Sequence, residues 1–332
     1  MSGHALIEVL VYLGLLAALV RPLGRYMEFI YGGRQGLAVE RWLYRATGIR
    51  EDQWMNWREY ASALLIFNAA GFAAVYVILR VQQWLPWNPQ AFSGLAPHTA
   101  FNIAVSFATN TNWQNYGGES TLGYFAQMAA LTVQNFLSAA SGMAVMAALA
   151  RGLAAQRAEA IGNFWADVVR GTLYVLLPLS LILAVALAAQ GVIQNLAPYA
   201  RADGSGQTLP MGPAASQVAI KQLGTNGGGF VNVNSAHPFE NPTPLTYFLE
   251  CLAILLIPAS LCYTFGRMVK DTRQGWALLA AMMVIFLPFL ALTVHAEQGN
   301  MEGKEARFGT AGSALWAVDR KSTRLNSSHV SQ

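Results

Sequence analysis

The chain has 332 residues, of which 54% are hydrophobic and 11% are charged, and its mean hydropathy is +0.35. Soluble domains usually carry about 25% charged residues, so the composition excludes an ordinary soluble domain and predicts an all-α polytopic membrane protein. The formal net charge is +4. Because no basic run is interleaved with base-stacking aromatic residues, we do not expect nucleic-acid binding.

Six apolar runs predict membrane-spanning helices. The first is short for a span, ends at Arg21-Pro22 and lacks the features of a cleaved signal peptide, so it is interpreted as a retained helix. A segment rich in arginine and tryptophan follows it, which predicts a cytoplasmic loop that lies partly on the membrane surface. The runs comprise residues 5–20, 60–79, 122–149, 171–192, 245–265 and 276–295.

Positive charges alternate between successive connections. The connection 81–121 contains no Lys or Arg, and the next one on the same side has Arg201 and Lys221. Positive charge is enriched on the cytoplasmic side, so we expect a multi-pass protein of the plasma membrane with its N-terminus outside. The charges assigned to the inside are Arg21, Arg25, Arg34, Arg41, Arg45, Arg50, Arg58, Arg151, Arg157, Arg170, Arg267, Lys270 and Arg273.

Two short apolar segments, 99–108 and 214–223, are too short to cross a membrane. The first runs into Thr109-Asn110-Thr111-Asn112-Trp113-Gln114, and the second into Gly224-Thr225-Asn226-Gly227-Gly228-Gly229. Irregular backbone at membrane depth is tolerated only where it is buried in protein or lines a water-filled path, and rings of carbonyls can replace an ion's hydration shell. We therefore predict two re-entrant helices with ion-selective loops. The alternative is a pair of ordinary outer loops.

The order span, short helix, polar loop, span occurs twice, with Thr109-Asn110 and Thr225-Asn226 at matching places. Internal duplication often puts the substrate path between repeats. A third copy begins at Trp276 and loses its apolar character after Val318. The predicted divisions are a first helix and interfacial loop (1–59), two pore repeats (60–150 and 164–266), the start of a third (275–318) and a tail (319–332). The tail is interpreted as non-native, or alternatively as a disordered native terminus.

Polar residues inside the spans are candidates for function or for helix packing. Glu250 lies about one turn into the fifth span, where it either acts in the ion path or reaches water near the interface. A polar stripe on the third span should face protein or water, and interhelical hydrogen bonding is preferred over the alternative, ion coordination. The stripe consists of Gln127, Gln134, Ser138 and Ser141.

His237 and Glu240 have the H-x-x-E spacing of some metal sites. Pro238 lies between them and no third ligand is near, so a structured outer loop is the preferred interpretation. Cys251 and Cys262 are eleven residues apart on one helix, too far for a mutual disulfide, and are interpreted as packing residues.

Four motifs carry a family resemblance that runs from about residue 5 to about residue 318. They are Arg21-Pro22-Leu23-Gly24-Arg25-Tyr26-Met27, the loop from Thr109 to Gln114, residues 224–244 with Asn232-Val233-Asn234-Ser235-Ala236-His237-Pro238-Phe239-Glu240-Asn241-Pro242, and Gly299-Asn300-Met301-Glu302-Gly303-Lys304-Glu305. With these motifs the chain resembles the potassium-transporting ATPase A chain (KdpA) family.

The resemblance implies tandem membrane-pore-membrane repeats of the potassium-channel type, with six transmembrane helices and two re-entrant pore helices in this segment. The family has four repeats, so filter loops 3 and 4 have no counterpart here, and the segment alone is not expected to enclose an ion. The implied filter residues are Thr111, Asn112, Gln114, Thr225, Asn226, Gly227 and Gly228. Asn112 and Gln114 either contact the ion path or satisfy backbone groups behind it.

The resemblance also implies a non-catalytic subunit of an ATP-driven potassium uptake complex in the bacterial inner membrane. Potassium is the substrate and no covalent cofactor is expected. The implied partners are a P-type ATPase catalytic subunit, small accessory subunits and membrane lipid. The sequence itself has no G-x-x-x-x-G-K-[ST] loop for a nucleotide. The alternatives are a stand-alone potassium symporter of the same superfamily, an intramembrane enzyme using His237 and Glu240, and a fragment with a structural role.

Overall fold

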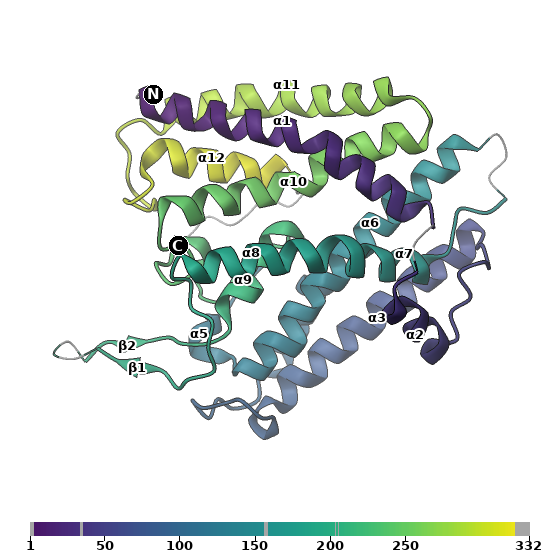
Figure 1. Ribbon diagram of the computed structural model, residues 1–332. Coiled ribbons are helices and arrows are strands. Elements are labelled where there is room, and N and C mark those ends of the chain that lie inside the picture. The colour runs from purple at the N-terminus through teal and green to yellow at the C-terminus, as the bar shows by residue number, and fades with distance from the viewer. Residues whose placement is uncertain (1–2, 34–35, 156–158, 203, 205, 323–332) are drawn as a thin grey trace. The chain divides into compact units, whose positions relative to one another are not determined.

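The computed structural model describes residues 3–33, 36–155, 159–202, 204 and 206–322. Arg34, Arg157 and residues 323–332 of the predicted tail lie outside the described residues. The elements in chain order (Figure 1) are α1 Gly3–Tyr31, α2 Ala38–Thr47, α3 Trp57–Val81, η1 Gln82–Trp84, α4 Pro97–Ala108, α5 Gly118–Thr121, η2 Ala126–Thr132, α6 Val133–Ala154, α7 Phe164–Arg170, η3 Gly171–Leu176, α8 Leu177–Ala189, β1 Ala200–Arg201, β2 Thr208–Leu209, α9 Ala214–Leu223, η4 Asn234–Ala236, α10 Pro244–Met268, α11 Thr272–Ala296 and α12 Gly309–Ser322.

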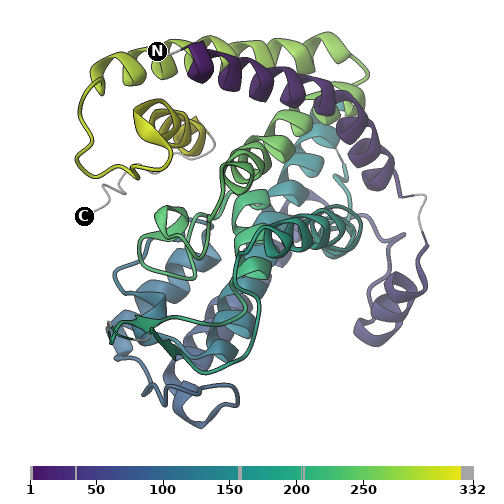
Figure 2. The same ribbon diagram turned by 60° about the vertical axis from the view of Figure 1, so that its left-hand side comes forward.

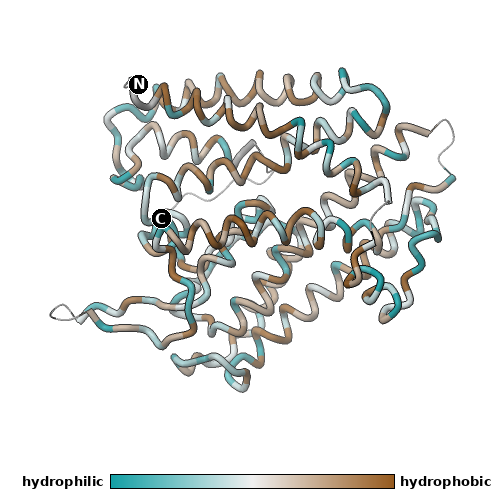
Figure 3. Tube along the Cα trace, in the orientation of Figure 1, coloured by the Kyte–Doolittle hydropathy of each residue, from teal (hydrophilic) through white to brown (hydrophobic). Residues whose placement is uncertain are grey.

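Six helical segments of the described chain are long and apolar enough to cross a membrane. They match the six predicted spans in order, and in Figure 3 their interiors are hydrophobic while hydrophilic residues gather at the turns. The all-α polytopic class predicted from composition is therefore confirmed. The segments are Leu6–Tyr31, Trp57–Trp84, Ala126–Ala154, Phe164–Ala189, Pro244–Met268 and Thr272–Ala296.

The predicted end of the first span at residue 20 is wrong, because α1 continues through Pro22 to Tyr31. Proline removes one helical hydrogen bond, but packing against a neighbouring helix can compensate in a spanning segment. That packing is close here: a Cβ on Gly24 would lie 2.9 Å from the carbonyl oxygen of Ser260, and Thr264 Oγ1 donates to the carbonyl of Gly24 at 3.1 Å.

The predicted start of the fourth span at residue 171 is also wrong, because the helical segment begins at Phe164. Asn163 caps it by accepting a hydrogen bond from the Ala166 amide at 3.2 Å. Arg170, assigned to a cytoplasmic loop, is instead buried in the helix and pairs with Glu40 at 3.1 Å. A buried cation needs such a partner, and the sequence pattern did not show one.

The loop predicted to lie on the membrane surface contains the amphipathic helix α2. Glu40 and Tyr44 lie on its buried face, where Tyr44 Oη donates to Glu40 Oε1 at 2.8 Å. Trp42 points away from that face and is 64% exposed. This division between faces is consistent with an interfacial helix, and the position at the membrane surface remains a prediction.

The described chain divides into two compact units, each assembled from separate stretches. The first comprises Met1–Leu65, Ala140–Leu177 and Cys251–Gln332, and the second comprises Ile66–Ala139 and Pro178–Glu250. The boundaries between the units cut through α3, α6, α8 and α10, so they do not follow the predicted repeat boundaries. The tandem-repeat organisation remains a prediction.

In the first unit α12 packs against α1 and α11, and these three helices lie side by side in Figures 1 and 2. Helix α12 begins at Gly309, within the predicted start of a third repeat (275–318), and continues beyond residue 318 to Ser322. Asp319 is fully buried and accepts a hydrogen bond from Tyr12 Oη at 3.2 Å. The predicted tail therefore begins inside a helix, and its non-native origin remains a prediction.

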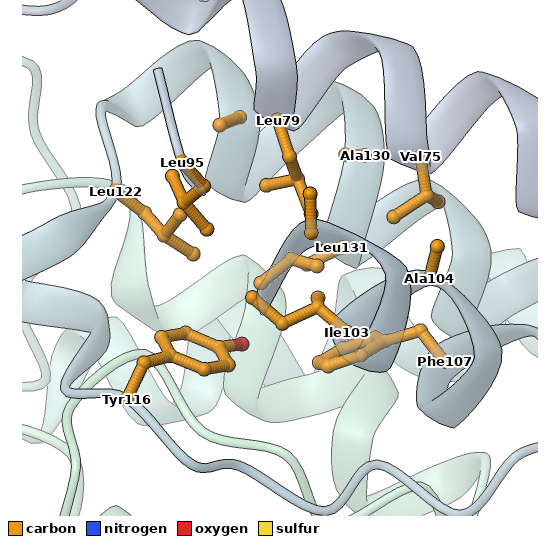
Figure 4. Close-up of a cluster of buried hydrophobic side chains, with 12 residues drawn as sticks. Val75, Leu79, Leu95, Ile103, Ala104, Phe107, Tyr116, Leu122, Ala130 and Leu131 are labelled. Atoms are coloured by element: carbon orange, nitrogen blue, oxygen red, sulfur yellow. The ribbon is translucent and has the colours of Figure 1, made fainter. Parts of the chain in front are cut away.

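The core of the second unit surrounds the short helix α4. Ile103 and Phe107 from α4 meet Leu79 from α3 and Leu131 from η2 (Figure 4). Tyr116 closes the same cluster from the loop after α4, and burial raises the pKa of its hydroxyl. This apolar packing holds the end of α4, and the polar loop that follows it, in a fixed position.

Candidate functional site

The predicted site residues lie in two loops of the second unit. Loop 1 is residues 109–114, directly after α4, and loop 2 is residues 224–229, directly after α9. The predicted short helices, 99–108 and 214–223, are observed as Pro97–Ala108 and Ala214–Leu223. Each loop therefore leaves the C-terminal end of a short helix, as the sequence analysis expected.

The two loops leave their helices with the same hydrogen-bond pattern. In each, two successive backbone amides donate to the carbonyl of the residue three positions before the loop begins. These bonds run from Thr111 N and Asn112 N to Ser106 O, at 2.9 Å each, and from Asn226 N and Gly227 N to Lys221 O, at 2.9 and 3.4 Å. The repetition shows that the two backbones take one course.

Left-handed backbone recurs at corresponding positions of both loops. In loop 1, φ is +58° at Asn110 and +53° at Asn112, and in loop 2 it is +55° at Thr225 and +88° at Gly227. A β-branched residue such as Thr225 rarely adopts positive φ, and such strain typically costs about 1–3 kcal/mol. Strained backbone that the surroundings maintain is a feature of ligand sites.

These conformations correct the predicted register between the loops. Matching the Thr-Asn dipeptides makes Thr109 equivalent to Thr225. The backbone geometry instead makes Asn110 equivalent to Thr225, and Asn112 equivalent to Gly227. The shift is one residue. It arises because hydrogen bonds from the ends of the helices set the course of each loop, and a shared dipeptide does not report them.

Side chains at the base of the loops tie loop 1 to loop 2. Asn226 Nδ2 contacts Asn110 Oδ1 and donates to Ser138 Oγ at 3.0 Å, and Ser138 Oγ donates to Asn110 Oδ1 at 2.9 Å. Asn110 Nδ2 in turn donates to the carbonyl of Gly224 at 3.3 Å. Ser138 belongs to the predicted polar stripe, so at this position the stripe supports the loops.

The side chain of Gln114 in loop 1 makes two hydrogen bonds to the backbone of Gly229 in loop 2. Its Nε2 donates to the Gly229 carbonyl at 3.0 Å, and its Oε1 accepts from the Gly229 amide at 2.8 Å. The side chain of Gln114 thus satisfies backbone groups of the other loop, one of the two roles considered for it.

The loops also meet through close contact. A Cβ on Gly228 would lie 2.7 Å from Phe107 Cζ and 3.1 Å from Asn112 Cβ, so only glycine fits there without a shift. The buried side chain of Asn112 points to α6, where its Nδ2 donates to Asn135 Oδ1 at 2.8 Å. Glycine in loop 2 is therefore required by packing as well as by conformation.

Other members of the polar stripe are buried in protein, as predicted. Gln127 in the π-helical segment η2 donates to the carbonyl of Phe230 at 3.2 Å and accepts from Gln217 Nε2 of α9 at 2.8 Å. Gln134 and Ser141 are likewise buried. Asn135 and Gln217 are not among the predicted site residues, although both are amides at helical spacing from stripe or loop residues.

The structure shows the surroundings of three charged residues near loop 2. Glu250 is fully buried, so it does not reach water, and it accepts from Gln222 Nε2 at 2.6 Å and Ser235 Oγ at 2.8 Å. Glu240 contacts Lys221, which was counted among the outer-loop charges but is buried.

His237 Nδ1 accepts from the Phe239 amide at 3.1 Å. No group of three or more His, Cys, Asp or Glu side chains suited to a metal ion occurs among the described residues. The loop itself is structured, since the amides of Glu240 and Asn241 both donate to the carbonyl of His237 at 3.0 Å.

Two polar loops, each following a short helix, thus lie in an all-α polytopic membrane protein. Over residues 10–331 the chain matches the family described as "Potassium-transporting ATPase A subunit" (KdpA). The chain belongs to this family, as the motifs predicted.

Curated relatives agree with this assignment. The chain is 52% identical to a protein of Methylococcus capsulatus and 54% identical to one of Sorangium cellulosum. Both are named "Potassium-transporting ATPase potassium-binding subunit". Each comparison covers 96% of this chain and 62% of the relative, so the chain spans less than two thirds of their length.

Proposed function

We propose that this chain forms part of the potassium-binding subunit of an ATP-driven potassium transporter, and that loops 1 and 2 line its selectivity filter. The supporting observation is the pair of loops with one backbone course, held against each other by Asn226 and Gln114. The names of the relatives support potassium as the ion.

In this proposal, backbone carbonyls of Thr111, Asn112, Thr225, Asn226 and Gly227 replace water around a dehydrated potassium ion. Carbonyl dipoles can bind K⁺ firmly enough for it to enter and weakly enough for it to leave. The side chains that join the loops are neutral amides and a hydroxyl, so they fix the spacing of the carbonyls without adding a charge that would trap the cation.

Potassium would enter from outside, with both loops on the outer side and the N-terminus outside, an orientation that the distribution of positive charge in the sequence favours. Energy would come from a separate P-type ATPase subunit, helped by small accessory subunits in the bacterial inner membrane. Further loops outside this chain would complete the filter.

The test is Gly227→Ala in the full-length protein that contains this segment, assembled with its partner subunits. An L-residue at φ +88° is strained by about 1–3 kcal/mol, and 1.4 kcal/mol corresponds to tenfold in affinity. We expect potassium-stimulated ATP hydrolysis to need roughly tenfold more potassium, with weaker discrimination against sodium.

Gly299→Ala is the matched control, because Gly299 also has positive φ, +79°, and lies outside both loops; a Cβ there would meet nothing within 4 Å. It should leave potassium affinity and discrimination unchanged. Unchanged values in Gly227→Ala would contradict the filter assignment.

A further inference from the structure

An ion pair is buried directly behind loop 2. Lys221 in the last turn of α9 and Glu240 in the connection to α10 are 1% and 0% exposed, and Lys221 Nζ contacts Glu240 Oε2. The other nearby carboxylate, Glu250, is held by Gln222 and Ser235. Glu240 is thus the carboxylate that pairs with the Lys221 ammonium group.

This pair is not explained by stability. Taking two charges out of water costs several kcal/mol per ion, and apolar residues of similar volume often replace a buried pair without loss of stability. A buried pair can instead specify one arrangement of the chain, a role that must be argued for each protein. The contacts of Lys221 and Glu240 provide that argument.

Lys221 and Glu240 bond to loop 2 and to the residues just after it. The backbone carbonyl of Lys221 accepts the amides of Asn226 and Gly227 within the loop. Glu240 Oε1 accepts the amide of Val231, two residues after the loop, at 2.8 Å, and its Oε2 contacts Lys221 Nζ. The chain from α9 through loop 2 to Val231 is therefore closed into a ring by the Lys221–Glu240 contact.

We propose that Lys221 and Glu240 are positioning residues that set the spacing of the loop 2 carbonyls and thereby the discrimination between potassium and other cations. The inference rests on the proposed filter function. Lys221 orients the Glu240 carboxylate, and Glu240 fixes the exit of the loop through Val231. Neither side chain contacts the ion.

The experiment compares two double variants in the full-length, assembled transporter. Lys221→Met with Glu240→Leu removes both charges and the acceptor for Val231. Lys221→Met with Glu240→Gln also removes both charges but leaves an amide oxygen that can accept from Val231. The readout is the ratio of apparent potassium to sodium affinity in ATP hydrolysis, which a purely structural role would not change in the assembled fraction.

We expect the ratio to fall roughly five- to tenfold in the Met/Leu variant, because the buried Val231 N–H loses its acceptor. The Met/Gln variant should recover part of the loss. Hydrogen exchange gives a second measurement: the Val231 amide should exchange faster in Met/Leu than in Met/Gln. Equal ratios and equal exchange in both variants and the parent would overturn the inference.

The matched control is an ion pair far from loop 2 in sequence, in which Asp167 is buried and Arg151 is 15% exposed. Arg151 Nη1 lies 2.6 Å from Asp167 Oδ2, both in the first unit. Arg151→Met with Asp167→Leu should lower the yield of complex but leave the ion ratio unchanged; a changed ratio would overturn the specific role of Lys221 and Glu240. If Gly227→Ala alters the ratio and the Lys221/Glu240 variants do not, this inference fails while the filter assignment stands.

Discussion

Loop 1 and loop 2 follow the same backbone course but are held in place by different chemistry. The carbonyl that accepts the two loop amides belongs to Ser106 of α4 for loop 1 and to Lys221 of α9 for loop 2. Ser106 Oγ reaches its own loop directly, donating to the Trp113 carbonyl at 3.0 Å, whereas Lys221 acts through Glu240 and Val231. One loop is supported by a neutral hydroxyl, the other by an ion pair.

The left-handed position shows a second difference. The Asn112 side chain donates a hydrogen bond to Asn135, 23 residues later, while the equivalent residue, Gly227, has no side chain. At the same separation after Gly227 lies Glu250, which bonds Gln222 and Ser235 instead. The two loops therefore share a backbone course, while the side chains that support each loop differ.

The largest expected effect on the free energy of unfolding comes from substituting Asn226, which joins the two loops. Thr111, the equivalent residue in loop 1, provides the comparison. Asn226→Leu removes the contacts to Asn110 and Ser138 in a fully buried place, and should lower the free energy of unfolding by about 3 kcal/mol. Thr111→Val should change it by about 0.5 kcal/mol or less. Thermal unfolding in detergent measures both, and equal losses would contradict the unequal roles.

An intermediate effect is expected from Gln114, whose partner is loop 2 backbone. Gln114→Leu leaves the amide and carbonyl of Gly229 without this partner and should cost about 2 kcal/mol, with weaker potassium affinity. Gln114→Glu can still accept from the Gly229 amide, so it should lose about half as much. A Glu variant as impaired as Leu would show that acceptance from the Gly229 amide adds nothing.

The smallest effect is expected from Ser106, the counterpart of Lys221. Ser106→Ala removes one neutral hydrogen bond to the Trp113 carbonyl and should cost about 1 kcal/mol, with nearly unchanged ion discrimination. A side-by-side measurement with Lys221→Met and Glu240→Leu sharpens the comparison. A loss of discrimination in Ser106→Ala as large as in that double variant would mean that both loops depend equally on this position.

The spans and the two short helices could be predicted because they depend on local composition. A run of about 20 apolar residues has few structures open to it in a bilayer, and the range 214–223 coincides with α9. Helix ends were less predictable: α1 passes through Pro22 because Ser260 and Thr264 pack against Gly24, and these contacts come from residues more than 200 positions away.

The candidate site was predictable as a set of residues but not as an arrangement. The glycines and amides of the two loops stand out in sequence, since polar, helix-breaking residues between apolar runs are costly unless they have a use. Three arrangements depend on where separate segments meet: Asn112 bonds Asn135, Gln114 bonds the backbone of Gly229, and Lys221 pairs with Glu240. Short-range patterns report helices and charge, whereas hydrogen-bond partners across 19 to 116 residues are set only when the chain packs.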